Sequence, residues 1–349
     1  MSLNTSSNSI LTNTNTPNTA NKQRIAHDEI LHRNTEKLRS ELGTTICGAL
    51  DSPEVIEIMV NPDGRIWIDR LSHGMTDTKK RISHERLVAA LGTIAAMLKT
   101  EVNKFSPILE GELPLDGSRV EGVLSPVTKA ASLVIRKHSS AVFPMERYVA
   151  EKRIDEMSWQ FLKDAITGRR NILIVGGTGS GKTTFVNAIL DALSRFCPND
   201  RIVILEDTVE LQCKMENVLA MRTDSQSNTT MQRLVKVSLR VRPDRIIVGE
   251  VRSGEALDLL KSWNTGHPGG ICTIHANSAA SALTRMEQLI SEVSRTPMRE
   301  LIGEAIDVVV FLRRVAKLGP FVTEILEVKG VNATGGYDYE YVYNNGGMK

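Results

Sequence analysis

The sequence of 349 residues has few aromatic side chains and no strong excess of charge of either sign. Aromatic residues make up only 4% of it, and 43 Lys and Arg nearly balance 41 Asp and Glu, for a formal net charge of +2. Such a balance argues against a strongly basic nucleic-acid coat and an acidic solvating tail, while leaving room for local patches. We therefore do not expect direct nucleic-acid binding to be the primary activity.

Cysteine is also scarce, and the four cysteines lie far apart in the sequence without a CxxC pair. This spacing excludes the usual patterns of a disulfide framework or a zinc site. We interpret the cysteines as reduced thiols of a cytosolic protein. They are Cys47, Cys197, Cys213 and Cys272.

Long apolar runs are missing. A membrane-spanning helix needs about 18 consecutive apolar residues, and no segment of this chain approaches that length. Residues 1–26 are rich in Ser, Thr and Asn and have no apolar stretch of signal-peptide length, so we expect a disordered leader there. Because the sequence has no lipidation motif and no obvious basic amphipathic helix, we expect any membrane attachment to run through partner subunits.

The first half of the chain mixes helical and strand patterns. Apolar residues recur with helical spacing over residues 27–50, and a second helix is predicted over about 84–99. Between them, the alternating segments 54–60 and 65–70 flank a Pro-Asp-Gly turn, which favours a β-hairpin. Short apolar pieces broken by Pro and Gly follow. Residues 27–140 are therefore predicted to form an α+β N-terminal domain.

The second half has a different pattern. Residues 141–170 indicate a linker followed by a helix, and from residue 171 short apolar strands alternate with longer amphipathic segments. This alternation is typical of a parallel α/β sheet covered by helices. We assign 171–336 to this second domain and expect the polar and aromatic residues 337–349 to form a frayed tail.

The strongest local signal is the phosphate-binding sequence GGTGSGKT, which begins at Gly176. It follows the apolar strand NILIV and precedes an amphipathic helix, which is the context that a P-loop requires. Glycines let backbone N–H groups close around phosphate oxygens, and the start of the helix adds its positive dipole end. The predicted nucleotide-binding residues are Gly176, Gly177, Thr178, Gly179, Ser180, Gly181, Lys182, Thr183 and Thr184.

Two residues of this loop carry the chemistry of a nucleoside triphosphate. Lys182 supplies a point charge to the β- and γ-phosphates, and the Thr183 hydroxyl is a ligand for Mg²⁺. A Lys-Thr pair at the end of the loop favours a triphosphate with a metal over a dinucleotide. The sequence thus predicts a P-loop NTPase with ATP and Mg²⁺ as its ligands.

Acidic residues follow two apolar strands downstream of this loop. Glu250 ends the segment IIVGE, and Glu206, Asp207 and Glu210 follow RIVIL. A carboxylate at the tip of such a strand can reach the hydration shell of Mg²⁺ or orient the attacking water. We expect Glu250 to act on the metal through water, and either Glu206 or Glu250 to orient the attacking water.

Two histidines flank the strand ICTI. His267 lies in a Gly/Pro-rich loop before it, and His275 follows it directly. An imidazole at such a site can sense the γ-phosphate, whereas a zinc site would need further ligands at metal spacing. We expect His267 to couple loss of the γ-phosphate to domain rotation.

At these residues the sequence resembles the secretion and traffic ATPase superfamily of type II and type IV machines. It is most similar to the VirB-type branch and, within it, to the TrbB-type conjugal-transfer ATPases. The segments that carry the resemblance span about residues 45–310: VIEIMVNPDGRIWIDR, GGTGSGKTT, ILEDTVELQC, SLRVRPDRIIVGEVRSGEALDLLK and TGHPGGICTIHAN. The resemblance names GGTGSGKT the Walker A box, residues 206–210 the Asp box, 246–250 the Walker B strand and 267–275 the His box.

This resemblance implies an α+β N-terminal domain followed by a RecA-like ATPase domain, assembled as a homo-hexameric ring. It also implies a cytoplasmic location at the inner face of the inner membrane, among the components of a type IV secretion or conjugation apparatus. N-terminal arginines approach the phosphates in such proteins, and Arg119 and Arg136 stand where they are expected. Arg252 belongs to the Walker B segment. Two departures are Ser253, where relatives often carry Asp, and Pro268, where many carry an acid.

Three functions stay open on the sequence alone. The first is a Mg-dependent ring ATPase that powers conjugative transfer or pilus assembly. The second is a RecA-like DNA translocase, against which the low net charge and few aromatics argue. The third is a nucleotide-gated scaffold with negligible turnover, against which the two acidic clusters argue.

Overall fold

The computed structural model describes residues 17–70, 73–137, 142–224, 227–315 and 319–345. The chain divides into two compact units. The first comprises the chain up to Ser52, Ile58–Trp67 and Asp77–Ile135, and the second comprises Pro53–Glu57, Ile68–Thr76 and the chain from Arg136 onward. Among the described residues, no helix combines the length and the apolar character needed to cross a membrane.

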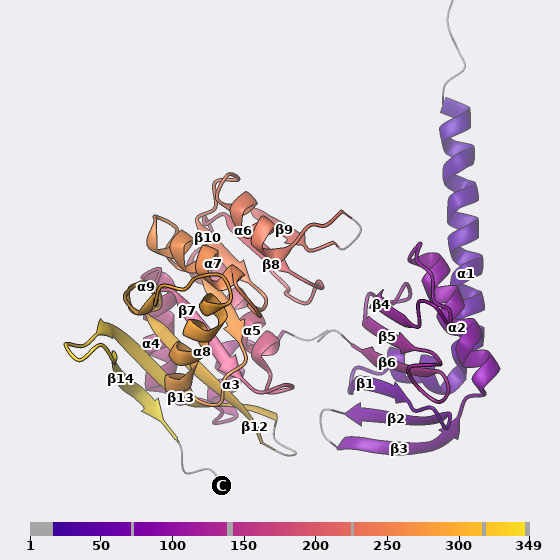
Figure 1. Cartoon of the computed structure of the whole chain (residues 1–349), viewed down its shortest axis with the longest axis horizontal. Coiled ribbons are helices and arrows are strands. Elements are labelled where there is room, and N and C mark those ends of the chain that lie inside the picture. Colours follow the sequence, from indigo (N-terminus) through magenta and orange to yellow (C-terminus); the bar gives the residue numbers. More distant parts are fainter. Residues whose placement is uncertain (1–16, 71–72, 138–141, 225–226, 316–318, 346–349) are drawn as a thin grey trace, which may run out of the picture. The chain divides into compact units, whose positions relative to one another are not determined.

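The N-terminal half of the chain forms two helices and a six-stranded sheet in the order β3-β2-β1-β6-β5-β4 (Figure 1). Its elements are α1 (Pro17–Asp51), β1 (Val55–Val60), β2 (Arg65–Arg70), β3 (Gly74–Arg81), α2 (His84–Met97), β4 (Ile108–Glu112), β5 (Arg119–Val123) and β6 (Ser132–Arg136). The predicted hairpin is present as β1 and β2. Its turn requires Gly64, which has a φ of +79° and whose N–H donates to the Asn61 carbonyl over 2.8 Å.

The two helices of the N-terminal half begin in different ways. Helix α1 begins at Pro17, so the prediction of a disordered leader is wrong for residues 17–26, whereas residues 1–16 lie outside the described part. It is interrupted at Gly43, which has a φ of +80°. Helix α2 begins after Ser83, whose hydroxyl accepts a hydrogen bond from the N–H of Arg86, as an N-cap should.

The C-terminal half forms an eight-stranded sheet in the order β14-β13-β12-β7-β11-β10-β8-β9. Strands β12, β7, β11, β10, β8 and β9 run parallel, and β13 and β14 add antiparallel strands beside β12. The central strands are buried throughout, because helices cover both faces of the sheet. The strands are β7 (Ile172–Gly176), β8 (Ile202–Glu206), β9 (Val218–Arg222), β10 (Arg245–Val248), β11 (Ile271–Ile274), β12 (Val308–Val315), β13 (Gly319–Val331) and β14 (Tyr337–Asn344).

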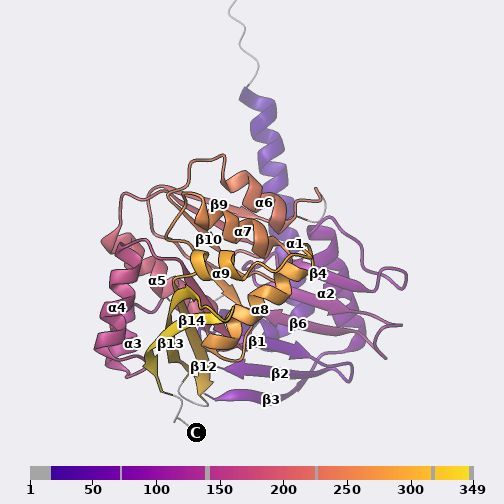
Figure 2. The same cartoon turned by 60° about the vertical axis from the view of Figure 1, so that its left-hand side comes forward.

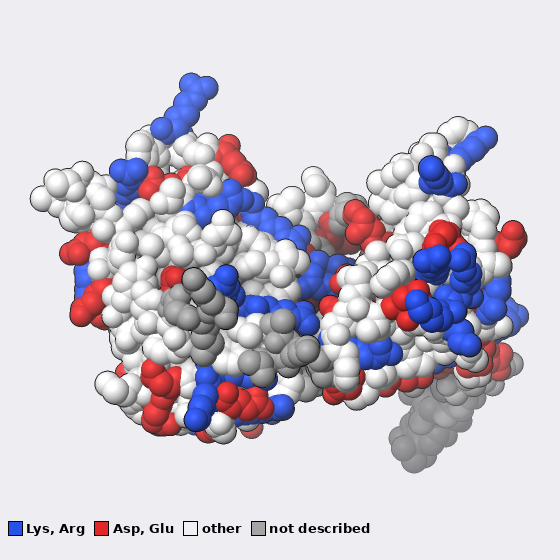
Figure 3. All heavy atoms as spheres, turned by 90° about the horizontal axis from the view of Figure 1, so that it is seen from below, with Lys and Arg blue, Asp and Glu red and all other residues white. Residues whose placement is uncertain are grey.

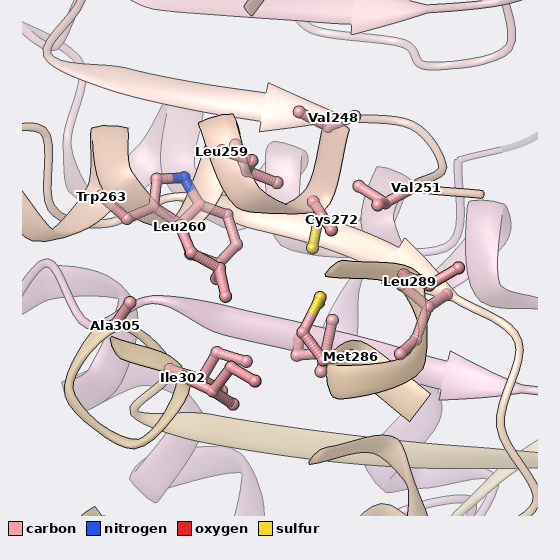
Figure 4. Close-up of a cluster of buried hydrophobic side chains, with 14 of the residues drawn as sticks. Val248, Val251, Leu259, Leu260, Trp263, Cys272, Met286, Leu289, Ile302 and Ala305 are labelled. Carbon is pink, nitrogen blue, oxygen red and sulfur yellow. The ribbon is translucent and has the colours of Figure 1, made fainter. Parts of the chain in front are cut away.

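Each face of this sheet has its own apolar core. One core joins the strands to residues of α6, α7, α8 and α9, and Figure 4 shows Leu260, Trp263, Cys272 and Met286 gathered in it. The other joins them to α3, α4 and α5. Figure 2 shows α7, α8 and α9 lying along the strands. The helices are α3 (Met145–Ala150), α4 (Glu156–Thr167), α5 (Lys182–Phe196), α6 (Met231–Ser238), α7 (Glu255–Asn264), α8 (Ala279–Ser291) and α9 (Arg299–Ala305).

The end of the chain differs from the prediction. Residues 337–344, expected to fray, form β14, which pairs with β13. Tyr337 packs against the first core and Tyr343 against the second, because irregular pairing lets the strand turn side chains toward both faces. The alternation of Tyr with polar residues was therefore a strand signal. Residues 346–349 of the predicted tail lie outside the described part.

Candidate nucleotide site

The phosphate loop connects the end of β7 to the start of α5. Gly181 is the N-cap of α5, has a φ of +91° and leaves the helix start without a side-chain cap. The first N–H groups of the helix are thus available to an anion. A Cβ atom on Gly181 would lie 2.5 Å from Cβ of Pro320, and one on Gly176 would lie 2.5 Å from the Leu312 carbonyl oxygen. The packing around the loop therefore requires glycine at both positions.

Lys182 lies folded over this loop, with only 8% of its surface exposed. Its ammonium group donates to the carbonyl oxygens of Gly176 and Gly177, each over 3.1 Å, and lies 3.4 Å from Nδ1 of His275. Burial lowers the pKa of Lys182 to about 8, and the charge of Glu250 opposes that change. The lysine thus stands at the mouth of the loop, where a phosphate can replace the carbonyl contacts.

The segment after β8 contacts the first turn of α5. The Thr183 hydroxyl donates to Oε2 of Glu210 over 3.2 Å. Glu206, only 4% exposed, accepts the N–H groups of Glu210 and Leu211 at one carboxylate oxygen, Oε1, over 2.8 Å each. Glu206 therefore shapes the turn that carries Glu210, and it is Glu210 that faces the threonine.

Glu250 follows β10 and lies between a cation and an imidazole. Its Oε2 accepts hydrogen bonds from Nε of Arg252 over 2.7 Å and from a terminal nitrogen of the same guanidinium over 2.5 Å. Its Oε1 lies 2.7 Å from Nε2 of His275. The other terminal nitrogen of Arg252 lies 3.3 Å from Oδ2 of Asp207. The carboxylates of two neighbouring strand ends thus share one guanidinium.

His275 follows β11 and links the lysine to the acid. Burial, and next the charge of Lys182, lower the pKa of His275, so the imidazole is neutral at pH 7. The short distances on both sides suit a tautomer in which Nδ1 accepts from Lys182 and Nε2–H points at Glu250. The result is a continuous polar chain from Lys182 to Asp207.

His267 is not part of this constellation within the subunit. It precedes β11, whereas the phosphate loop follows β7, and these strands pair in parallel from Ile271 with Ile172 to Ile274 with Val175. The four residues of β11 span about 13 Å at 3.3 Å per residue. His267 therefore lies at the opposite edge of the sheet and is not brought to the phosphate loop of its own subunit, and its predicted role in coupling stays a prediction. His275 lies at the phosphate loop instead.

The remaining predicted residues fall in two places. Gly177, Thr178, Gly179 and Ser180 form the loop itself, and Thr184 lies in the first turn of α5. Arg119 begins β5 and Arg136 ends β6 of the six-stranded sheet, and their part in the phosphate site stays a prediction.

Two polar residues that support the site were missed from the sequence. Asn187 is fully buried on α5 and bonds the segment after β8 twice, donating to the Glu210 carbonyl over 3.3 Å and accepting the Gln212 N–H over 2.8 Å. Glu255 begins α7 and accepts the N–H groups of Arg252 and Ser253 over 2.7 and 3.0 Å. Asn187 could have been noticed as a polar residue among the apolar residues of its helix. Glu255 could have been noticed as an acid in the first turn of a helix.

The site consists of a glycine loop between a parallel strand and a helix, with Lys-Thr at the end of the loop and acids at the ends of neighbouring strands. These features define a nucleotide-binding P-loop protein of RecA-like fold. A family model described as "Type II/IV secretion system protein" matches residues 44–344. The chain belongs to this family.

Similar proteins agree with that assignment. The chain is 46% identical to a probable conjugal transfer protein TrbB of Sinorhizobium fredii, over 88% of this chain and 93% of that one. It is 28% identical to the type IV secretion system protein VirB11 of Bartonella quintana, over 84% and 96% of the two chains. The X-ray structure of the Legionella pneumophila ATPase DotB has the same fold, with a TM-score of 0.60 at 21% identity, over 81% of this chain and 79% of that one.

Proposed function

We propose that the protein is a Mg-dependent ATPase that powers a type IV secretion or conjugative DNA-transfer apparatus. The observation that carries the proposal is the polar chain in which Lys182, His275, Glu250, Arg252 and Asp207 follow one another at 2.5 to 3.4 Å around the phosphate loop. The family and the relatives named above support the transport role.

The buried lysine and the acid beside it suit phosphoryl transfer to water. Lys182 would exchange the carbonyls of Gly176 and Gly177 for the β- and γ-phosphate oxygens of ATP. Glu250 would orient the attacking water, because its Oε1 is set against a neutral imidazole rather than a second cation. His275, which lies 3.4 Å from Lys182 and 2.7 Å from Glu250, would then register the loss of the γ-phosphate.

The oxygen ligands near α5 suit a hard divalent cation. Thr183 and Glu210 present a hydroxyl and a carboxylate within 3.2 Å of each other, and Mg²⁺ prefers such ligands together with phosphate oxygens and water. When bound, Mg²⁺ would neutralise charge on the phosphates. Thr183 would hold it directly and Glu250 through water. Glu206 is then a residue that shapes the Asp-box turn, which leaves Glu250 as the preferred base.

The assembly and location follow the same proposal. We propose a homo-hexameric ring, peripheral to the inner face of the inner membrane, that works with the membrane and cytoplasmic components of the apparatus. Arg119 and Arg136 would spread their guanidinium groups over the charge that develops on the phosphates. Opening and closing between domains would transmit the work of hydrolysis.

The test is phosphate release by the purified protein with Mg-ATP, together with light scattering with and without nucleotide. We expect turnover to fall at least about 100-fold in Lys182→Ala, which removes a cation that stabilises the phosphates, and in Glu250→Gln, which removes the carboxylate that orients the attacking water. Lys214→Ala, a surface lysine that is 66% exposed, is the control and should keep its activity. A particle near six subunit masses supports the ring. Binding of ATP without Lys182-dependent turnover would reject the ATPase and favour a nucleotide-gated scaffold.

A further inference from the structure

The side chain of Arg252 joins the residues that follow β8 and β10. Its guanidinium places two nitrogens on Oε2 of Glu250, at 2.7 and 2.5 Å, and the third 3.3 Å from Oδ2 of Asp207. A planar group with donors in a fixed fork can hold two carboxylates at a set separation. The Walker B acid and the Asp box are thus held in one frame.

The backbone under this side chain is also held. Glu255, 9% exposed, accepts the N–H groups of Arg252 and Ser253 at Oε1, and its Oε2 accepts the Ser253 hydroxyl over 2.7 Å. These bonds fix the turn between β10 and α7, from which the guanidinium extends. Ser253 therefore has a structural partner of its own.

The two carboxylate oxygens of Glu250 therefore have different neighbours. Oε2 accepts hydrogen bonds from Arg252, whereas Oε1 is buried and lies 2.7 Å from Nε2 of His275. We propose that Arg252 is a positioning residue for ATP hydrolysis: it holds Oε2 of the Glu250 carboxylate, so that Oε1 is turned toward His275 beside Lys182, and it ties that orientation to Asp207. This inference rests on the proposed ATPase function.

The test replaces Arg252 by lysine, which keeps the charge but has a single ammonium in place of the fork. We expect kcat of Arg252→Lys to fall about 10- to 100-fold, because a misdirected base costs rate in the chemical step. We expect KM for ATP, and the Kd for Mg-ADP measured by calorimetry, to change less than about threefold, since Arg252 is placed to act on Glu250 rather than on the bound nucleotide. A merely structural role would change the melting temperature and Mg-ADP binding together with kcat.

Arg299→Lys is a closely matched control. Arg299 pairs with Glu287 over 3.0 Å, and the two side chains are 51% and 22% exposed, against 52% and 20% for Arg252 and Glu250. Its pair joins α8 to α9 rather than two strand tips of the site. We expect this variant to keep kcat within about twofold, as surface ion pairs contribute little.

The bridge to Asp207 is tested with a double-mutant cycle. If Arg252 joins the two carboxylates, Asp207→Asn should lower kcat by less than Arg252→Lys does, and combining them should add little further loss. Fully additive losses would overturn the bridge.

The remaining outcomes are distinct. A kcat of Arg252→Lys within threefold of an active wild type, or a loss matched by weaker Mg-ADP binding, would overturn the positioning role. Absence of turnover in the wild type would instead reject the proposed function on which that role rests.

Discussion

Single carboxylates in this site are distinguished by their hydrogen-bond donors rather than by their residue type. Glu206 receives backbone N–H groups, Glu210 the Thr183 hydroxyl, and Glu250 a guanidinium. Each donor set assigns a different task, because a carboxylate oxygen that already holds two strong donors is a poor acceptor for the proton of water. The three acids of one active site are therefore not interchangeable.

The ionised carboxylate of Glu255 should make the stability of the fold depend on pH. Burial, the largest influence, alone would raise the pKa of Glu255, but the N–H groups of Arg252 and Ser253 and the Ser253 hydroxyl hold that pKa below its usual 4.5. A carboxylate with a lowered pKa stabilises the fold above about pH 4.5, and this contribution is lost as the pH falls through the folded-state pKa. We expect Glu255→Gln to lower the free energy of unfolding at pH 7 by about 1–3 kcal/mol.

Denaturant unfolding of wild type and Glu255→Gln between pH 3.5 and 7 measures this difference. The difference in unfolding free energy should shrink as the pH falls toward and through the lowered folded-state pKa of Glu255. Glu300→Gln is the matched control, since Glu300 is another acid in a first helical turn but is exposed, and it should change the unfolding free energy by less than about 0.5 kcal/mol. An equal loss at every pH would contradict the role of the ionised carboxylate.

At the scale of elements, the site exists because parallel strands end at a common edge. Strands β7, β8, β10 and β11 are parallel neighbours, so the residues that follow them meet at their carboxyl ends. Helix α5 then begins at the loop after β7, and Asn187 ties it to the segment after β8. The same rule separates His275 from His267, which follow and precede one strand.

Strand β14 should contribute to the stability of the fold through its half-buried tyrosines. Tyr337 and Tyr343 are half-buried against the two cores, whereas Tyr339 on the same strand is 38% exposed. We expect Tyr337→Ala to lower the free energy of unfolding by about 1–3 kcal/mol, through lost apolar contact, and Tyr339→Ala by less than half of that. Thermal and denaturant unfolding measure both. Equal, small losses would mean that β14 adds little to the fold.

At the scale of the whole molecule, the sequence has nearly equal numbers of basic and acidic residues. On the face drawn in Figure 3, groups of Lys and Arg lie beside groups of Asp and Glu. The formal net charge of +2 agrees with this mixture. Binding to nucleic acid depends on many phosphate contacts with Lys and Arg and is therefore strongly dependent on salt.

We expect ATP turnover of the purified protein to be unaffected by added single- or double-stranded DNA. Phosphate release measured at 50 and 200 mM salt, with and without DNA, provides the test. Stimulation by DNA of more than about threefold that disappears at the higher salt would favour a translocase that acts on the strand itself.

Local patterns in the sequence determined much of the fold. The P-loop, the β1–β2 hairpin, the helices and the central parallel strands were predicted from apolar spacing and turn residues, because these patterns are local features of the sequence. The sequence also indicated that residues after β8, β10 and β11 belong to one site, since strand direction is a consequence of the βα alternation.

Tertiary structure decided which atoms meet. Strand β14 forms in a tail expected to fray, because its pairing with β13 and the packing of Tyr337 and Tyr343 outweigh local composition. The contact of His275 with Lys182 joins residues 93 positions apart, and that of Glu210 with Thr183 joins residues 27 positions apart. Sequence spacing carries no information on such contacts, whereas the packed sheet sets them to within a hydrogen-bond length.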